Sequence, residues 1–325
     1  MIGCARAIWA FDRDLRQPHE TTSVHPTMTT TPVDLSATLE VACDLQAAIG
    51  EGPIWDATNS TLLVVESVGG RIYRYHPAEG RLTSCEAGQP LGVAIPRRGG
   101  GLVASGCDGL LAVDERSGKV ELLVPVERDN TDTRMNDAKC DSRGRLWGGT
   151  FSTTFAGKVG VLYRIDPDLR VTAAATGIYI SNGIAWSPDE SLMYYVDTAR
   201  RGIDMFDYDI ATGSIVNRRR FVDIDRPHGL PDGITVDAEG CLWVALFLGG
   251  AVRRYSPAGE WLGTVTLPVA GVTSCGFGGD GLTDLYITTG RHLDAKSKMP
   301  VEPQAGALFR CRPGVAGLPP HFFAG

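Results

Sequence analysis

Apolar runs of about six residues recur along the chain from residue 51 onward, and Gly- and Asp-rich turns separate them. The pattern repeats six times. Its clearest members are the second runs of the repeats, which read TLLVVE (61–66), GLVASG (101–106), RLWGGT (145–150), LMYYVD (192–197), CLWVAL (241–246) and DLYITT (284–289). A weaker fourth run closes most repeats, as an outer-edge strand would. Short strands at even spacing with turns between them predict the four-stranded antiparallel blades of a β-propeller.

We therefore predict an all-β fold, a six-bladed β-propeller with a central channel. A helical solenoid would need apolar stripes with a period of 3.6 residues, and the chain shows none. One further strand pattern, ATLEVACDL at 37–45, precedes the first repeat, while the last repeat has only a weak fourth run. Pairing the two would hide two open sheet edges. One domain over residues 35–325 is expected, preceded by an extended or disordered segment, 1–34.

Polar residues recur at one position of this repeat. Four residues before the apolar residue near the end of each first run stand Glu51, Leu91, Asn136, Asn182, Asp232 and Thr273. Repeat position sets radial position in a propeller, so the four strong oxygen donors among them should face one level of the channel. Asn182-Gly183 and Asp232-Gly233 are also common turn dipeptides, and that alternative stays open. Scattered turn residues have no reason to share a register, which favours a site.

Two carboxylates and two amide oxygens, with no histidine or thiolate, are typical of a site for a hard cation. The carboxylates of Glu51 and Asp232 would repel each other in a channel of limited polarity unless one were protonated or a cation lay between them. We expect one divalent ion, Ca, Mg, Mn or Zn, with Ca favoured. Glu66 and Asp197 end second runs at matching positions, where they either support the ligands or are solvated strand ends.

Charge, hydropathy and cysteine pattern narrow the partners. The net charge of −7 argues against nucleic acid or an anionic membrane as a partner, and no run approaches the length of a membrane span. The eight cysteines are scattered singly with no C-x-x-C pair, which predicts free thiols and a reducing, cytoplasmic compartment. A small-molecule partner and a monomer or weak oligomer are expected.

The chain resembles the regucalcin (senescence marker protein) and gluconolactonase family. The resemblance is carried by GEGPIWD (50–56), RMNDAKCDSRGRLWGGT (134–150), SNGIAWSPDESLMYYVD (181–197), PDGITVDAEGCLWVA (231–245) and TSCGFGGDGLTDLYITT (273–289). It departs from the family in the neutral Ser152, Thr153 and Thr154, where some relatives carry acidic residues that contact substrate. It also departs at Glu66, where Asp is usual, and in the segment 91–101.

The resemblance implies that Glu51, Asn182 and Asp232 ligate one divalent metal. It implies that Asn136 faces the substrate or a metal-bound water, that Arg134 binds sugar hydroxyls, and that Asp232 doubles as the catalytic base. The implied activity is the hydrolysis of small sugar lactones, with the ion as Lewis acid on the carbonyl and a water activated by Asp232.

Other functions compete with this one. The same site would suit an organophosphate or other lactone hydrolase, and a calcium-binding regulatory protein would need no chemistry at all. A scaffold propeller of the WD-repeat kind predicts no register of oxygen donors and is disfavoured. The chain has no G-x-S-x-G elbow, so a covalent serine route is disfavoured too. His228 is the one histidine near a site motif, where a structural or substrate-proximal role is expected before a catalytic one.

Overall fold

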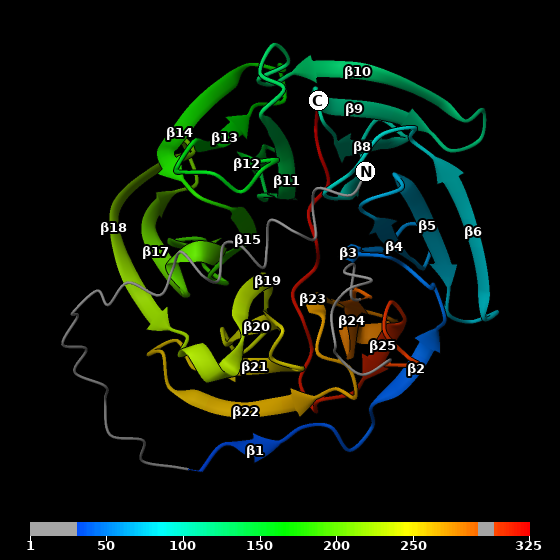
Figure 1. Ribbon diagram of the computed structural model, residues 1–325, viewed down its shortest axis with the longest axis vertical. Helices are drawn as coiled ribbons and strands as arrows, with labels where there is room; N and C mark the ends of the chain where they lie inside the picture. The colour runs from blue at the N-terminus through cyan, green and yellow to red at the C-terminus, as the bar shows by residue number, and fades with distance from the viewer. Residues whose placement is uncertain (1–30, 292–301) are drawn as a thin grey trace.

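The computed structural model describes residues 31–291 and 302–325 as six β-sheets arranged around a central channel (Figure 1). The predicted six-bladed propeller with four-stranded antiparallel blades is confirmed. Most of the segment predicted to be extended or disordered, residues 1–30, lies outside the described residues. The described part also contains three short 3-10 helices, η1 (Thr198–Arg200), η2 (Arg226–His228) and η3 (Asp280–Leu282).

Each blade runs outward from the channel, with its first strand innermost. The first two blades consist of β3 (Gly50–Asp56), β4 (Thr61–Glu66), β5 (Arg71–His76) and β6 (Arg81–Glu86), then β7 (Ala94–Pro96), β8 (Leu102–Ser105), β9 (Gly109–Asp114) and β10 (Lys119–Pro125). The third and fourth consist of β11 (Thr133–Cys140), β12 (Leu146–Ser152), β13 (Gly160–Ile165) and β14 (Val171–Ile178), then β15 (Ser181–Trp186), β16 (Leu192–Asp197), β17 (Gly202–Asp209) and β18 (Ser214–Asp223). The last two contain β19 (Leu230–Val236), β20 (Leu242–Phe247), β21 (Ala251–Tyr255) and β22 (Trp261–Thr266), then β23 (Val272–Gly278), β24 (Asp284–Thr289) and β25 (Leu308–Cys311).

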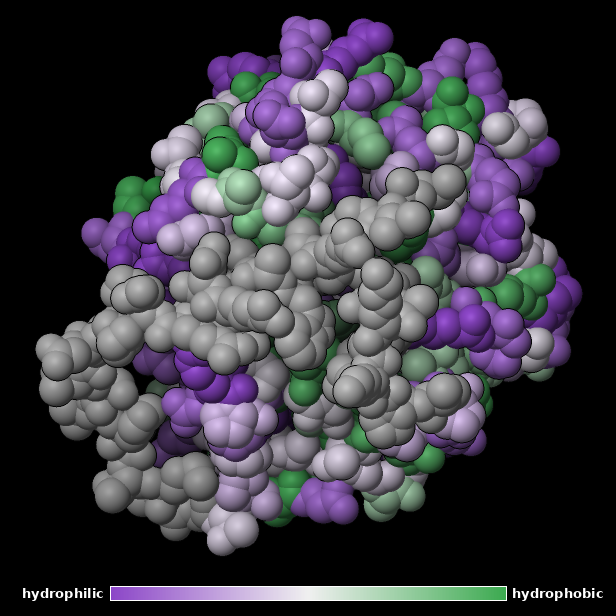
Figure 2. Space-filling view, viewed as in Figure 1, coloured by the Kyte–Doolittle hydropathy of each residue, from purple (hydrophilic) through white to green (hydrophobic). Residues whose placement is uncertain are grey.

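The inner strands are more deeply buried than the outer ones. This explains why the inner strands form clear apolar runs in the sequence and the outer strands form weaker ones. Strands β12 and β15 are buried at every position, so they read as continuous apolar or small-residue runs. Strands β6 and β18 are exposed at many positions because one of their faces meets solvent. Hydrophilic residues accordingly dominate the periphery of the face drawn in Figure 2.

The ring closes through the N-terminal part of the chain, as predicted. Strand β2 (Glu40–Cys43) pairs antiparallel with β25, with Val41 opposite Phe309, and completes the sixth blade. Strand β1 (Val33–Asp34) then adds a fifth strand to the fifth blade, parallel to β22. Both additions cover strand edges that would otherwise be open to pairing with another chain.

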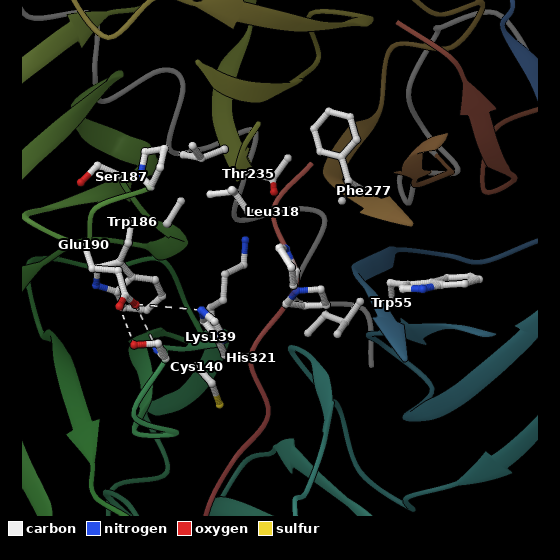
Figure 3. Close-up of a pocket in the computed structure, with 18 of the residues that line it drawn as sticks. Trp55, Lys139, Cys140, Trp186, Ser187, Glu190, Thr235, Phe277, Leu318 and His321 are labelled. Atoms are coloured by element: carbon white, nitrogen blue, oxygen red, sulfur yellow. Dashed lines mark hydrogen bonds and ion pairs between the residues drawn. The ribbon is translucent and has the colours of Figure 1, made fainter. Parts of the chain in front are cut away.

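A C-terminal segment, 313–325, crosses one end of the channel, and no periodic pattern in the sequence predicted it (Figure 1). Its backbone bonds to the turns of several blades, for example from Ala324 N to Gly144 O at 3.0 Å, and the ring of Phe323 is fully buried. A chamber of about 300 Å³ lies between this segment and the ends of five inner strands. Lys139 points into it and donates from Nζ to the Ile234 carbonyl at 2.7 Å (Figure 3).

No helix in the described ranges has both the length and the apolar character that a membrane crossing requires. The seven cysteines of those ranges are free thiols, as the absence of paired spacing predicted.

In two blades, a fully buried aspartate stabilises the turn between the first and second strands. Asp237 accepts from the backbone N–H groups of its own turn, from Trp243 Nε1 at 2.9 Å and from Arg254 Nε at 2.9 Å. Asp141 makes the same contacts in the third blade, with Trp147 Nε1 at 3.1 Å and Arg145 Nε at 2.6 Å. The repeated D-x-x-G-x-L-W phrase therefore encodes a turn, an ion pair and the anchoring of a core tryptophan.

Replacing Asp237 by alanine is expected to lower the free energy of unfolding by about 3 kcal/mol, because the variant leaves a buried guanidinium and an indole N–H without their acceptor. Urea denaturation followed by tryptophan fluorescence measures the change. Asp209→Ala, at an exposed turn, is the matched control and should cost much less. Equal losses in the two variants would contradict the structural role of Asp237.

Candidate metal centre

The five residues predicted to form the site all line one cavity of about 100 Å³ at the start of the inner strands. Glu51, Asn136, Asn182 and Asp232 come from β3, β11, β15 and β19, and Arg134 precedes Asn136 on β11. Thr273 of β23 completes the level, whereas Leu91 of the second blade does not reach the cavity. The cavity lies at the opposite end of the channel from the C-terminal segment, because the same inner strands end in the chamber beneath that segment.

A bulge at one repeat position turns these side chains into the channel. Between Glu51 and Ile54, strand β3 advances three residues while β4 advances two. The same irregularity follows Met135 in β11, Ser181 in β15 and Pro231 in β19. A bulge bends its strand and re-aims the side chains next to it. The bulge begins one residue before the donor in β11, β15 and β19 and at the donor itself in β3, so four polar residues of different blades lie beside a bulge at one level.

Asn182-Gly183 and Asp232-Gly233 lie inside β15 and β19, so their interpretation as turn dipeptides is wrong. Glycine is needed because neighbouring inner strands approach closely at this level. A Cβ on Gly183 would lie 2.6 Å from the Asp232 carbonyl oxygen, and one on Gly233 would lie 2.0 Å from Ser274 Oγ. The glycines bring the strands close enough for their donors to converge.

The Asn182 amide is held in one orientation by Thr198, which the sequence did not single out. Asn182 Nδ2 donates to Thr198 Oγ1 at 3.1 Å, and Thr198 Oγ1 donates to the Pro231 carbonyl at 3.0 Å. Asn182 Oδ1 is left buried without a hydrogen-bond partner among the described residues, and so is Asp232 Oδ1. Asn136 is held similarly, since its Nδ2 donates to the Ser181 carbonyl at 2.8 Å.

The two carboxylates of the level are strained electrostatically. Desolvation, followed by repulsion from Asp232 and Asp137, raises the pKa of Glu51 well above its ordinary value. Desolvation and repulsion from Asp137 likewise raise the pKa of Asp232, although a hydrogen bond from Asn182 partly opposes the shift. Either group therefore ionises at a cost unless positive charge compensates it.

These residues fit a divalent cation. Buried polar atoms are normally hydrogen-bonded, so the orphaned oxygens of Asn182 and Asp232 at one level indicate a missing partner that accepts their lone pairs. Hard cations take such oxygen ligands from carboxylates and amides. The ligand set combines carboxylates with amide oxygens. No group of three or more His, Cys, Asp or Glu side chains suited to a metal occurs in the described ranges.

Glu66 and Asp197 support the segments that lead into the ligand strands. Asp197 accepts from Tyr179 N at 3.2 Å and Ile180 N at 3.0 Å, just before Asn182. Glu66 accepts from Val68 N at 3.2 Å and from Ile49 N at 3.4 Å, just before Glu51. Of the two roles the sequence left open, the structure favours positioning over solvated strand ends.

His228 does not line the cavity and packs edge-on against Trp261, with ring centroids 6.1 Å apart. Burial and the nearby Arg253 lower its pKa. This contact is structural.

Two further rings of cavity residues follow the same repeat register, and Arg134 alone among their members had been predicted. The first ring stands two residues before the four oxygen donors, within or directly before the inner strands, and consists of Ile49, Arg134, Ile180 and Leu230. Ser67, Phe151, Thr198 and Phe247 occupy one equivalent position at or just beyond the ends of second strands. Extending the repeat alignment by these two positions would have found them.

Comparison with known proteins gives one consistent family. A family model described as the SMP-30/gluconolactonase/LRE-like region matches residues 49–291. Regucalcin of Danio rerio is 35% identical over 298 residues, covering 89% of this chain and 100% of the relative. A luciferin-regenerating enzyme has a TM-score of 0.83 at 33% identity, covering 88% of this chain and 99% of that one. A calcium-binding protein, regucalcin, of Agrobacterium tumefaciens has a TM-score of 0.85 at 27% identity, covering 91% and 100%.

Replacing Thr198 by valine should weaken calcium binding about 10-fold, because the Asn182 amide loses the acceptor that orients it. Isothermal titration calorimetry measures the dissociation constant. Thr153→Val, in the loop after β12, is the control and should bind calcium as the wild type does. Unchanged affinity in Thr198→Val would show that the amide needs no such support.

The metal-free protein should lose stability as pH rises from about 5 to 8. The unfolded carboxyls titrate near 4, while the folded pKa values of Glu51 and Asp232 are raised. Above pH 4 the unfolded chain has therefore released protons that the folded chain keeps, and the free energy of unfolding falls until the folded groups also ionise. Thermal melts of chelated protein measure the slope.

Asp232→Asn should flatten this slope by removing one of the two charges. Added calcium should raise the melting temperature of the wild type but not that of Asp232→Asn. Asp114→Asn, at an exposed turn, is the control. A slope that Asp232→Asn leaves unchanged would refute the electrostatic strain inferred for this level.

Proposed function

Because this chain belongs to the SMP-30/gluconolactonase/LRE-like family, we propose that it is a metal-dependent hydrolase that opens small lactones in the cavity around Asp232. The observation that carries the proposal is the pair of buried, unpartnered oxygens on Asn182 and Asp232, beside a second carboxylate at the same level. Glu51, Asn182 and Asp232 would hold the ion, with calcium favoured. Sugar lactones are the substrates that the family resemblance implies.

A bound divalent cation would polarise the lactone carbonyl and offset the negative charge that develops on its oxygen. The chain's own residues supply positioning and proton transfer. The Asp232 carboxylate, besides holding the ion, would accept a proton from the attacking water. The water oxygen bonds to the carbonyl carbon, the ring C–O bond breaks, and the proton passes from Asp232 to the leaving alkoxide. The product is the open hydroxy acid.

Arg134 and Asn136 orient the ring. The Arg134 guanidinium lies over the Phe151 ring at 4.7 Å and donates from Nη1 to the Met135 carbonyl at 3.1 Å, which fixes its plane at the cavity wall. The Asn136 amide is fixed by its bond to Ser181. A substrate held between two such preset groups needs little further ordering to reach the reactive geometry.

A calcium-binding regulatory role is the second candidate. It is favoured by the names of two relatives, Regucalcin and a calcium-binding protein. The same ligand residues would serve it, so the two candidates differ only in whether bound substrate is turned over.

A chelator assay separates them. We expect calcium-loaded protein to release acid from a panel of six-membered and five-membered lactones, measured at constant pH, and we expect EDTA to abolish the release. Asp232→Ala should remove both calcium binding and turnover while circular dichroism stays unchanged, because the blades close through strands. Asp114→Ala is the control. Tight calcium binding with no lactone opened would favour the regulatory role, and full turnover in Asp232→Ala would refute the site assignment.

A further inference from the structure

The wall above the oxygen donors is apolar. Three of the four residues that stand two positions before the donors are Ile49, Ile180 and Leu230, and Arg134 is the exception. Side chains two residues apart on a strand point the same way, so these residues meet whatever part of a substrate projects beyond the reacting carbonyl.

Aromatic side chains extend this wall toward the mouth of the cavity. Phe151 and Phe247 come from the ends of β12 and β20, and Phe155 comes from the loop after β12. The rings of Phe151 and Phe155 lie 5.4 Å apart, and Phe155 has a φ of 57°, which is uncommon for a residue with a side chain. Such a backbone conformation persists only where its surroundings maintain it and is concentrated at functional sites. Here it places a ring in the cavity lining.

The hydroxyl groups at the same height are already engaged. Ser67 Oγ donates to the Leu91 carbonyl at 2.5 Å, and Thr198 Oγ1 is shared between Asn182 and the Pro231 carbonyl. Neither hydroxyl can donate to a substrate without breaking an existing bond.

The hydroxyl side chains at the end of β12 and in the loop after it, Ser152, Thr153 and Thr154, do not supply partners either. Ser152 Oγ bonds to Thr154 Oγ1, Thr153 Oγ1 donates to the Asp132 carbonyl, and none of the three lines the cavity. A sugar lactone carries several hydroxyls, and each one buried without a partner weakens binding.

We infer that the preferred substrates are lactones bearing an apolar alkyl or aryl substituent, with polyhydroxylated sugar lactones as poorer substrates. The inference rests on the proposed function, since it concerns the ring that the same site opens. The carbonyl end lies at the level of Glu51 and Asp232, and the substituent lies against Phe151, Phe155 and Phe247.

Three lactones that share a six-membered ring test this order. δ-Decalactone carries a pentyl chain, δ-valerolactone carries no substituent, and glucono-δ-lactone carries hydroxyls. With calcium-loaded wild-type protein we expect kcat/KM to fall in that order, by about 10-fold or more at each step, because hydrophobic pockets discriminate by roughly that factor per group. If the glucono-lactone is opened as fast as δ-decalactone or faster, the inference is wrong and the proposed function stands. If no lactone is opened, the proposed function fails and the inference falls with it.

Variants of the aromatic side chains test which residues of the cavity produce this substrate preference. Phe155→Ser and Phe247→Ser should each lower the ratio of kcat/KM for δ-decalactone over glucono-δ-lactone about 10-fold, while Phe155→Leu restores most of it. Val216→Ser, which removes an exposed apolar side chain from β18, is the control and should leave the ratio unchanged. The ketone 3-pentylcyclohexanone has the ring and side chain of δ-decalactone, but water cannot open it. Its affinity, measured by calorimetric titration, should be lower in the two serine variants, which reports binding without turnover. Wild-type ratios and affinities in both serine variants, with native thermal melts, would overturn the assignment of these walls.

Discussion

Repulsion between two carboxylates at one level of a narrow channel is the constraint on which the site depends. Glu51 and Asp232 face the same cavity, and desolvation together with a third acid, Asp137, makes their ionisation costly. Positive charge along the channel offsets part of this repulsion. Burial raises the pKa of Asp137, and the positive charge of Lys139 opposes this shift only in part. The Lys139 side chain points toward the end of the channel that the C-terminal segment crosses (Figure 3). Arg134 offsets part of the charge of Glu51, and a divalent cation would balance what remains on Glu51 and Asp232.

The repeat is what makes this arrangement possible. A propeller presents the same strand position to the channel from every blade, and in four blades a bulge at or next to that position bends the strand there. The blades themselves are held by other means. Buried aspartates at the turns bind tryptophan and arginine, and β2 closes the ring on β25. Since the scaffold closes without the ion, residues at the cavity are free to oppose one another electrostatically.

The repeat period accounts for the fold and for the level of the oxygen donors, whereas Arg134 and the choice of ligands were implied by the family resemblance. It predicted six blades, closure through the strand near residue 40, and the level shared by Glu51, Asn136, Asn182 and Asp232. It could not predict the crossing of the channel by the segment 313–325, because that segment forms no repeat and is held by single backbone bonds to several blades. It also missed Phe155, whose place in the cavity depends on one left-handed backbone angle in a loop. Asn182-Gly183 was ambiguous because the close approach of neighbouring strands, which requires the glycine, is visible only in three dimensions.

The cavity has two levels that differ in the chemistry of their residues. In the proposed function, the oxygen donors would suit any substrate with a carbonyl to polarise, because they would act on the reacting atoms alone. Above them, Arg134 and the apolar side chains meet the parts of the substrate that do not react. These upper residues are distributed between strand ends and the loop after β12, where a substitution leaves the bulges and the donors in place. In the proposed function, chemistry and substrate preference would therefore be carried by different parts of each blade, and the preference could change while the electrostatic balance of the channel is kept.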